Sequence, residues 1–314
     1  MLAPLRTIGP TPVPLPAPLE PYDLRVWRLD IDVQAEPAAC DLAVLSPREL
    51  ARLRGYRHGA DRARFAAARA ALRRLLAEVL DLAPDAVPLD ADPLGKPRLP
   101  QAVHGAPSFN VSHSGSIGWI ALATDPEIAA VGVDIEQCRP VEPLALAASA
   151  FAPAEQAMLR GCHPAQRLDR FYALWTAREA LTKAAGTGIA DARWQAVALH
   201  GSGDGRWRPH GPGAGLPTAV AAWHPAEATQ VVSLPCQSRP GDTPYRAAVA
   251  LLTRPRVAPL SRHAGEGLGE RERQWHVDEF GSGKRPFPLP PPPPASGGGG
   301  KHHCLFYTYD AAHA

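Results

Sequence analysis

The amino-acid sequence predicts an α+β chain made of two similar-sized halves that meet near residues 131–134. The predicted elements run in the order strand, helices, strands, and then helices and strands again, which favours this class. The 314 residues are enough for one large domain or two small ones, with a core that needs no disulfide or metal. No internal repeat relates the two halves at the level of sequence.

The first half contains a proline-rich arm, a strand and two helices. Residues 1–22 alternate proline with small apolar residues, which predicts an extended, polyproline-like arm without a core of its own. Ordered structure is expected to begin near Leu24, where the alternating segment LRVWRLDIDV predicts a strand. Ser46 followed by Pro47 predicts a helix start. From Asp61 onward, apolar residues follow the spacing of an amphipathic helix.

The rest of the chain alternates further strands and helices. Strands are predicted for PSFNVSHS, GWIALAT, IAAVGVDIE, WQAVALH, PTAVAAWH, TQVVSLP and YRAAVALL. Helices are predicted for FAPAEQAMLR and for QRLDRFYALWTAREALTKAAG, the second ending near Gly186. Beyond Thr253 a proline run and a glycine run predict a disordered tail. The expected divisions are therefore residues 1–22, 23–132, 133–253 and 254–314.

Composition excludes several classes of protein. The five cysteines form no CxxC pair, which argues against a secreted disulfide scaffold and against a zinc site. No apolar run approaches the roughly 20 residues that a membrane span needs. A net charge of +2 does not indicate a polyanion-binding protein. We expect a cytoplasmic protein with no membrane and no nucleic-acid partner.

Two acidic residues end a predicted apolar strand. Asp134 and Glu136 lie two positions apart in AAVGVDIE, so both carboxylates leave the same face. Such neighbours raise each other's pKa unless a cation lies between them. Mg²⁺ suits the pair if substrate phosphates complete its ligand shell. A solvated strand end is the alternative.

A third acid lies on the long second helix. Trp175, Glu179 and Lys183 are spaced i, i+4, i+8 in WTAREALTKAAG and share one helix face. Trp175 would anchor the helix in the core, Glu179 could bind a metal or take a proton, and Lys183 could pair with a phosphate. An exposed Glu–Lys ion pair is the equally open alternative.

The segment FNVSHSG ends a predicted strand at a glycine. Its Ser112, His113 and Ser114 could meet a phosphate there. A Ser–His hydrolase is disfavoured, because adjacent strand residues point to opposite faces and the chain has no GxSxG elbow. A structural role for His113 is the alternative.

Basic residues form two further candidates. Lys96 and Pro97 occupy a turn-rich loop that could flank a nucleotide. Nine arginines lie between Arg48 and Arg74, in a predicted helical region. Arg62, Arg69 and Arg73 form a stripe that could bind nucleic acid, nucleotide phosphates or an acidic partner, or could be a solvated face.

Taken together, these motifs resemble the Sfp-like 4′-phosphopantetheinyl transferases. The matching segments are SPRELARLRGYRHGADRARF, LGKPRLP, FNVSHS, VGVDIE and FYALWTAREALTKAAGTGI, from about Ser46 to Ile189, with looser similarity out to YRAAVALL. GVDIE and the W-T-x-[KR]-E-x-x-x-K pattern are the most specific. The resemblance implies two pseudo-symmetric α/β halves with the site at their junction.

The resemblance also implies a metal site and catalytic groups. Asp134, Glu136 and Glu179 would hold Mg²⁺ on the pyrophosphate of coenzyme A. Lys183 and His113 would contact its phosphates and supply positive charge to the reaction. Glu179, directly or through a metal-bound water, would accept the proton of the attacking serine.

Further residues would bind the coenzyme A co-substrate. The resemblance gives Ser112 a place beside the phosphates, and Lys96 and Pro97 a place beside the adenine. Arg52 and Arg64 align loosely with basic positions near the 3′-phosphate. The family often has lysine where this chain has Arg178, a departure that lies about 100° round the helix from Glu179 and leaves the metal site unaffected.

The implied reaction moves phosphopantetheine from coenzyme A to a serine of an apo acyl or peptidyl carrier protein. The product is 3′,5′-ADP, and a monomer is the simplest expectation. Fatty-acid, polyketide and peptide synthesis all use such carriers, and the sequence does not choose between them. The rival hypotheses are a non-catalytic module that binds coenzyme A or carrier protein, a nucleic-acid binder, and a different Mg²⁺-dependent nucleotide enzyme.

Overall fold

A computed structural model describes residues 9–92, 95–103, 105–187, 189, 192–210, 229–236 and 243–254. The predicted tail from residue 255, the first eight residues of the arm and the strand predicted for PTAVAAWH lie outside the described residues. None of the helices in the described part is both long and apolar enough to cross a membrane.

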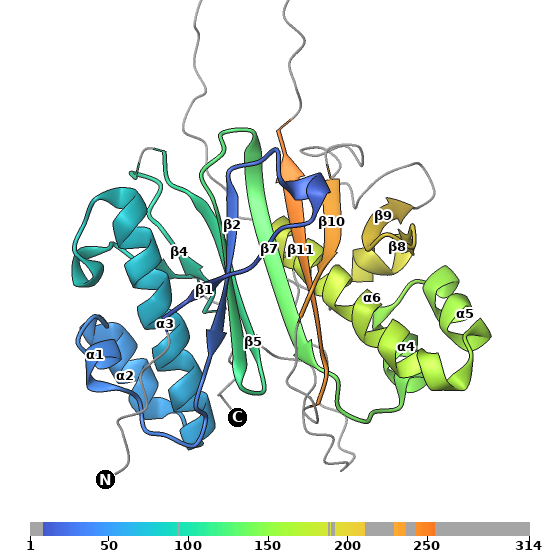
Figure 1. Ribbon diagram of the computed structural model, residues 1–314, viewed down its shortest axis with the longest axis horizontal. Coiled ribbons are helices and arrows are strands. Elements are labelled where there is room, and N and C mark those ends of the chain that lie inside the picture. The colour runs from blue at the N-terminus through green and yellow to red at the C-terminus, as the bar shows by residue number, and fades with distance from the viewer. Residues whose placement is uncertain are drawn as a thin grey trace, which may run out of the picture. The chain divides into compact units, whose positions relative to one another are not determined.

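Two antiparallel sheets form the centre of the structure (Figure 1). The first has the strand order β1-β2-β6-β5, and its strands are β1 Thr11–Pro12, β2 Leu24–Asp30, β5 Ser108–Ser114 and β6 Ile117–Ala123. The second has the order β7-β11-β10-β9-β8, and its strands are β7 Ile128–Gln137, β8 Ala198–Gly201, β9 Arg206–His210, β10 Thr229–Leu234 and β11 Tyr245–Thr253. A small hairpin pairs β3 Asp90–Ala91 with β4 Pro97–Arg98.

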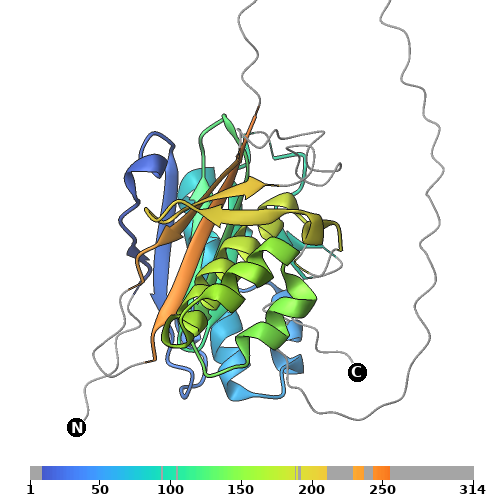
Figure 2. The same ribbon diagram turned by 90° about the vertical axis from the view of Figure 1, so that its right-hand side faces the viewer.

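The helices cover the outer faces of these sheets. Those beside the first sheet are α1 Ala39–Leu42, α2 Pro47–Gly55 and α3 Gly59–Leu80. Those beside the second are α4 Pro143–Ala150, α5 Pro153–Gly161 and α6 Pro164–Ala185, which lie in front of the sheet in Figure 2. Short 3₁₀ turns are η1 Ala17–Leu19, η2 Pro84–Ala86 and η3 Ala192–Ala196.

Three large apolar clusters follow from this layering. One lies between α3 and the first sheet and contains Leu72 and Ile120. Another lies between the second sheet and its helices and contains Trp175, as the helix-face pattern predicts. The third draws on both sheets, with Trp119 from β6 and Val133 from β7. The two sheets therefore share one core and do not fold as separate domains.

The proline-rich arm is more ordered than its composition indicates. The expectation that structure begins near Leu24 is wrong, because β1 pairs with β2 and Leu19 is fully buried in the core shared by the sheets. Pro12 is tolerated in β1 because this strand forms the edge of its sheet, where a missing backbone N–H leaves no ladder bond broken.

Two boundaries also differ from the sequence-based expectation. β7 begins at Ile128 and belongs wholly to the second sheet, so the change of sheet comes before Ile128 and not between residues 132 and 133. The segment WQAVALH is not one strand: Trp194 lies in η3, and the strand begins at Ala198. Both tryptophan and alanine are compatible with either element, so tertiary packing decides.

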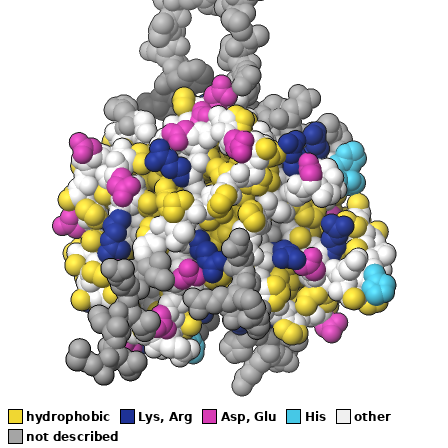
Figure 3. Space-filling view, viewed as in Figure 1, with side chains coloured by type: hydrophobic (Ala, Val, Ile, Leu, Met, Phe, Trp, Pro, Cys, Tyr) yellow, Lys and Arg dark blue, Asp and Glu magenta, His cyan; other side chains and the backbone are white. Residues whose placement is uncertain are grey.

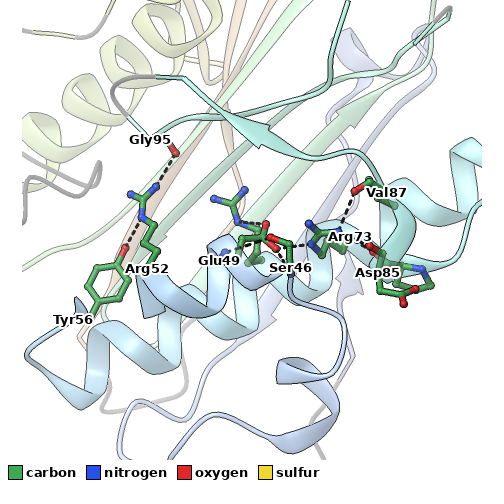
Figure 4. A network of polar contacts seen from close by, with 10 residues as sticks. Ser46, Glu49, Arg52, Tyr56, Arg73, Asp85, Val87 and Gly95 are labelled. Carbon is green, nitrogen blue, oxygen red and sulfur yellow. Dashed lines mark hydrogen bonds and ion pairs between the residues drawn. The ribbon is translucent and has the colours of Figure 1, made fainter. Parts of the chain in front are cut away.

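The helix pairs α2–α3 and α5–α6 have matching lengths and matching Glu–Arg contacts. α2 and α5 are nine residues long, and α3 and α6 are 22 residues long. Glu49 caps α2 at the predicted N-cap Ser46 and binds Arg73 of α3 at 2.7 Å (Figure 4). Glu155 caps α5 in the same way and binds Arg178 of α6 at 2.7 Å. Each arginine follows the first residue of its helix by 14 positions.

Gly132, in the VGVDIE segment, lets α6 approach β7 closely. A Cβ added at this position would lie 2.0 Å from the carbonyl oxygen of Ala180 and 2.6 Å from the amide nitrogen of Ala184. Both neighbours are helix backbone atoms, which cannot move without displacing α6. A glycine is therefore required here for helix–sheet packing.

We predict that Gly132→Ala lowers the melting temperature by about 2–12 °C, because overpacking costs about 1–3 kcal/mol and 1 kcal/mol shifts the melting temperature by about 2–4 °C in a domain of this size. Gly161→Ala is the matched control, since nothing lies within 4 Å of its added Cβ. Differential scanning calorimetry of both variants tests this. Equal melting temperatures for the two would contradict it.

Candidate active site

A line of side-chain hydrogen bonds joins the edges of the two sheets. β5 is an edge strand of the first sheet, and β7 is an edge strand of the second. Within the second sheet, β7 pairs with β11 on one side, and its other side faces β5. Alternate β5 side chains accept the backbone N–H groups that β7 directs toward them. These bonds are Val131 N to Ser108 Oγ at 2.9 Å, Val133 N to Asn110 Oδ1 at 2.9 Å, Ile135 N to Ser112 Oγ at 3.4 Å and Gln137 N to Ser114 Oγ at 3.1 Å. We call this line the β5–β7 seam.

The seam brings three of the predicted residues into direct contact. Ser112 Oγ donates to Asp134 Oδ1 at 2.8 Å. Lys183 Nζ donates to the same carboxylate oxygen at 2.6 Å and to Ser112 Oγ at 3.2 Å. All three side chains are buried. The register of β5 on β7 thus places an anion, a cation and a hydroxyl from three elements within hydrogen-bonding distance.

The charges of this group affect the pKa values of the other two predicted acids, Glu136 and Glu179. Burial raises the pKa of Glu136 well above its usual value, and the negative charges of Asp134 and Glu179 raise it further. Burial also raises the pKa of Glu179 to about 7, an effect that Lys183 opposes and Asp134 reinforces. Ser114 Oγ donates to Glu136 Oε2 at 2.9 Å. The predicted acids therefore form one electrostatically coupled cluster.

His113 lies at the same strand end on the opposite face of β5. Its side chain is half-buried, and desolvation lowers its pKa to about 4, with further lowering by the positive charges of Arg64 and Lys183. The imidazole is therefore neutral at physiological pH. Arg64 Nε donates to the carbonyl of Gly115, in the turn that follows β5, at 2.7 Å. The structure thus brings His113 and Arg64 together beside the acidic cluster.

Lys96 crosses from the first half of the chain to α6. Its Nζ donates to the backbone carbonyl of Lys183 at 2.7 Å, and desolvation lowers its pKa. Pro97 follows in β4, paired with Ala91. Arg52 reaches the same loop from α2, with Nη1 donating to the carbonyl of Gly95 at 3.4 Å (Figure 4).

The arginine stripe is mainly structural in its inner part. Arg69 and Arg73 are buried and bind Glu49 at 3.5 and 2.7 Å, and Arg62 pairs with Glu36. On the face shown in Figure 3, basic and acidic side chains are interspersed and form no continuous basic surface. The inner arginines are therefore engaged with glutamate, and the absence of a nucleic-acid partner stays a prediction.

Arg178 is likewise buried and bound to other groups of the second half of the chain. It binds Glu155 and donates to the carbonyls of Val197 and Trp194 at 2.8 and 2.7 Å. Its positive charge still lowers the pKa of Glu179, so the expectation that this position leaves the metal site unaffected stays a prediction.

Sequence reasoning missed the groups that organise the site. Ser108, Asn110 and Ser114 were not assigned seam contacts, and Gly132 was not assigned a packing role. One signal in the sequence was available, since the polar residues of SFNVSHS alternate with period two. Such a pattern on a strand that enters a core indicates that its polar face meets another backbone and not solvent.

The donor set fits a hard divalent cation, although the cluster is not closed around one. Within the described ranges, no group of three or more His, Cys, Asp or Glu side chains is arranged to hold a metal ion by itself. Asp134 Oδ2 is buried without a hydrogen-bond partner in this part of the chain, beside two acids whose ionised forms are disfavoured. Oxygen donors of this kind suit Mg²⁺ when ligand phosphates supply the missing oxygens.

Comparison with known proteins gives a consistent result for both halves. Residues 34–127 match the family model described as 4′-phosphopantetheinyl transferase, N-terminal, and residues 130–238 match the 4′-phosphopantetheinyl transferase superfamily. The change between the models coincides with the start of β7.

Individual relatives carry the same description. A putative 4′-phosphopantetheinyl transferase of Synechocystis is 43% identical over 149 residues, which are 47% of this chain and 59% of the relative. The 4′-phosphopantetheinyl transferase HetI of Nostoc is 36% identical over 180 residues, 56% of this chain and 74% of the relative. Sfp of Bacillus subtilis is 27% identical over 149 residues, 48% of this chain and 63% of the relative. The chain thus spans less than two thirds of the length of some of these relatives and about three quarters of HetI, and it belongs to the 4′-phosphopantetheinyl transferase family.

Proposed function

We propose that this protein transfers the 4′-phosphopantetheine group of coenzyme A to a serine of an apo carrier protein with the help of Mg²⁺. The observation that carries the proposal is the coupled cluster of Asp134, Glu136, Glu179 and Lys183 at the β5–β7 seam. Three acids clustered around a single lysine, which is bound to Asp134, suit a site for a metal-bound pyrophosphate.

Asp134, Glu136 and Glu179 would hold the metal. The unpartnered Oδ2 of Asp134 is the natural first ligand, and the other two acids lie within electrostatic reach of it. Mg²⁺, when bound there, would neutralise charge on the pyrophosphate of coenzyme A. Lys183 is held beside Asp134 and can pair with a phosphate oxygen.

In the proposed reaction, the serine hydroxyl of the carrier forms a bond to the β-phosphorus of coenzyme A. The bond from that phosphorus to the bridging oxygen breaks, and 3′,5′-ADP leaves with the electron pair. Glu179 would accept the serine proton, as a positioned carboxylate can in general base catalysis. Positioning and charge neutralisation supply most of the acceleration in such transfers.

The remaining predicted residues would bind coenzyme A around this centre. Ser112 and His113 flank the cluster on β5, and His113 can donate a hydrogen bond to a phosphate as a neutral ring. Lys96, next to Pro97, reaches the end of α6 and would bind the adenine side. Arg52 and Arg64 are proposed for the 3′-phosphate.

We further propose that the two halves are pseudo-symmetric. The support is the equal length of α2 and α5, the equal length of α3 and α6, and the Glu–Arg contact that each pair contains. A cytoplasmic monomer, without membrane or nucleic-acid partners, completes the proposal.

The decisive test is the intact mass of an apo carrier protein after incubation with this protein, coenzyme A and Mg²⁺. We expect a gain of one phosphopantetheine that EDTA abolishes. Several carriers, from fatty-acid, polyketide and peptide synthesis, should be included because the natural partner is not known. Binding of coenzyme A without any gain in mass on all of them would favour the non-catalytic module.

We predict that Glu179→Gln lowers the transfer rate by about a hundredfold or more, the usual contribution of a positioned acid–base group. Its fold should persist, because glutamine has nearly the same shape as glutamate. Glu78→Gln, an exposed acid on α3, is the matched control. Near-normal turnover by Glu179→Gln would remove Glu179 from the mechanism.

A pH effect on stability follows from the raised pKa of Glu179. The folded protein holds this proton up to a pKa of about 7, whereas the unfolded chain releases it near the ordinary glutamate pKa of 4.5. Stability from this group therefore falls as pH rises between the two values. In metal-free solution, Glu179→Gln should therefore raise the melting temperature relative to wild type at pH 8 but not at pH 4.5.

Differential scanning fluorimetry of both proteins at the two pH values measures this difference. Mg²⁺ should reduce it at pH 8 by stabilising the wild-type carboxylates. A pH-independent difference between the two proteins would contradict the assigned origin of the shift.

A further inference from the structure

The four side chains of the β5–β7 seam do not all make the same contacts. Ser108 and Asn110 accept a backbone N–H from β7, and in the described part of the chain neither is bonded to a carboxylate. Ser112 and Ser114 accept a backbone N–H as well, and each also donates its hydroxyl hydrogen to an acid of β7. The two serines nearest the proposed site therefore also bind its carboxylates.

Ser114 shows this combination of one accepted and one donated hydrogen bond in its simplest form. Its Oγ accepts from Gln137 N at 3.1 Å and donates to Glu136 Oε2 at 2.9 Å. A serine hydroxyl has only one hydrogen, so the bond from Gln137 directs that hydrogen toward the carboxylate. Ser112 has a comparable arrangement, but its oxygen also receives a bond from Lys183, which would complicate any variant there.

Glu136 needs such an anchor more than Asp134 does. Its side chain has one more rotatable bond than that of Asp134. Asp134 is also held by Lys183, whose Nζ lies 2.6 Å from Asp134 Oδ1. Glu136 is buried, so solvent does not hold its carboxylate in place. The bond from Ser114 to Oε2 fixes the rotation of the carboxylate relative to β5. Among the described residues, no hydrogen-bond donor reaches Oε1, so this oxygen can meet a ligand.

We propose that Ser114 is a positioning residue that orients Glu136 for a divalent cation. The inference rests on the proposed function, because it takes Glu136 to be a metal ligand. Hydrogen-bonding partners of metal ligands commonly affect affinity 10- to 100-fold.

The test uses Mn²⁺ alone, whose binding to the full-length protein is followed by electron paramagnetic resonance without coenzyme A or carrier protein. Ser114→Ala should weaken Mn²⁺ binding about tenfold. Ser108→Ala is the matched control, since it removes the same kind of seam bond, to Val131 N, far from the acids. Ser114→Thr keeps the hydroxyl on a strand that tolerates β-branched residues and should restore binding.

A second readout separates positioning from loss of stability. The Mg²⁺ concentration that gives half-maximal transfer should rise for Ser114→Ala and not for Ser108→Ala, whereas both should lose similar small amounts of melting temperature. Wild-type affinity for Mn²⁺ in Ser114→Ala, or equal weakening in Ser108→Ala, overturns the role of Ser114 and leaves the proposed transfer intact. Absence of Mn²⁺ binding and of transfer in the wild type overturns both proposals.

Discussion

The structure depends on how the two sheets meet, which is through side chains and not through a backbone ladder. β7 presents its N–H groups to β5 at alternate positions, and leaving a buried N–H unpaired costs about 1–3 kcal/mol. Serine and asparagine oxygens of β5 satisfy these groups with a constant separation of 23 residues. Because the side-chain period of a strand is two, a slip by one residue would replace Ser112 and Ser114 with Val111 and His113 and would lose every seam bond.

The same constraint builds the candidate site. Once β5 and β7 are in register, Ser112 faces Asp134 and Ser114 faces Glu136, and Gly132 lets α6 bring Lys183 against the pair. Burying acids in this way disfavours their ionised forms unless a cation compensates. The raised pKa values of Glu136 and Glu179 reflect that cost. Within the proposed function, the cost becomes affinity for Mg²⁺, since the metal supplies the missing positive charge.

The helical layers hold this centre from both sides with buried Glu–Arg pairs. Glu49 and Arg73 tie α2 to α3, and Arg73 also donates to the carbonyl of Val87, which leads toward the β3–β4 hairpin and Lys96 (Figure 4). Glu155 and Arg178 tie α5 to α6. Removing one member of such a buried pair usually destabilises a protein by about 3–5 kcal/mol, so these arginines act on the site through the scaffold.

The sequence by itself determined the main helices and strands and named the candidates for the site. The helix start at Ser46, the helix end at Gly186 and the strands that carry Ser112 and Asp134 follow from local capping and periodicity, and Trp175, Glu179 and Lys183 share a face because of helical spacing. Only the tertiary structure decided which polar residues meet. Three features join residues that are distant in sequence: the side-chain contacts between β5 and β7, the burial of Leu19 in the shared core, and the ion pairs of Arg73 and Arg178 with glutamates. No local pattern encodes such contacts, because they depend on which surfaces pack together once the chain is folded.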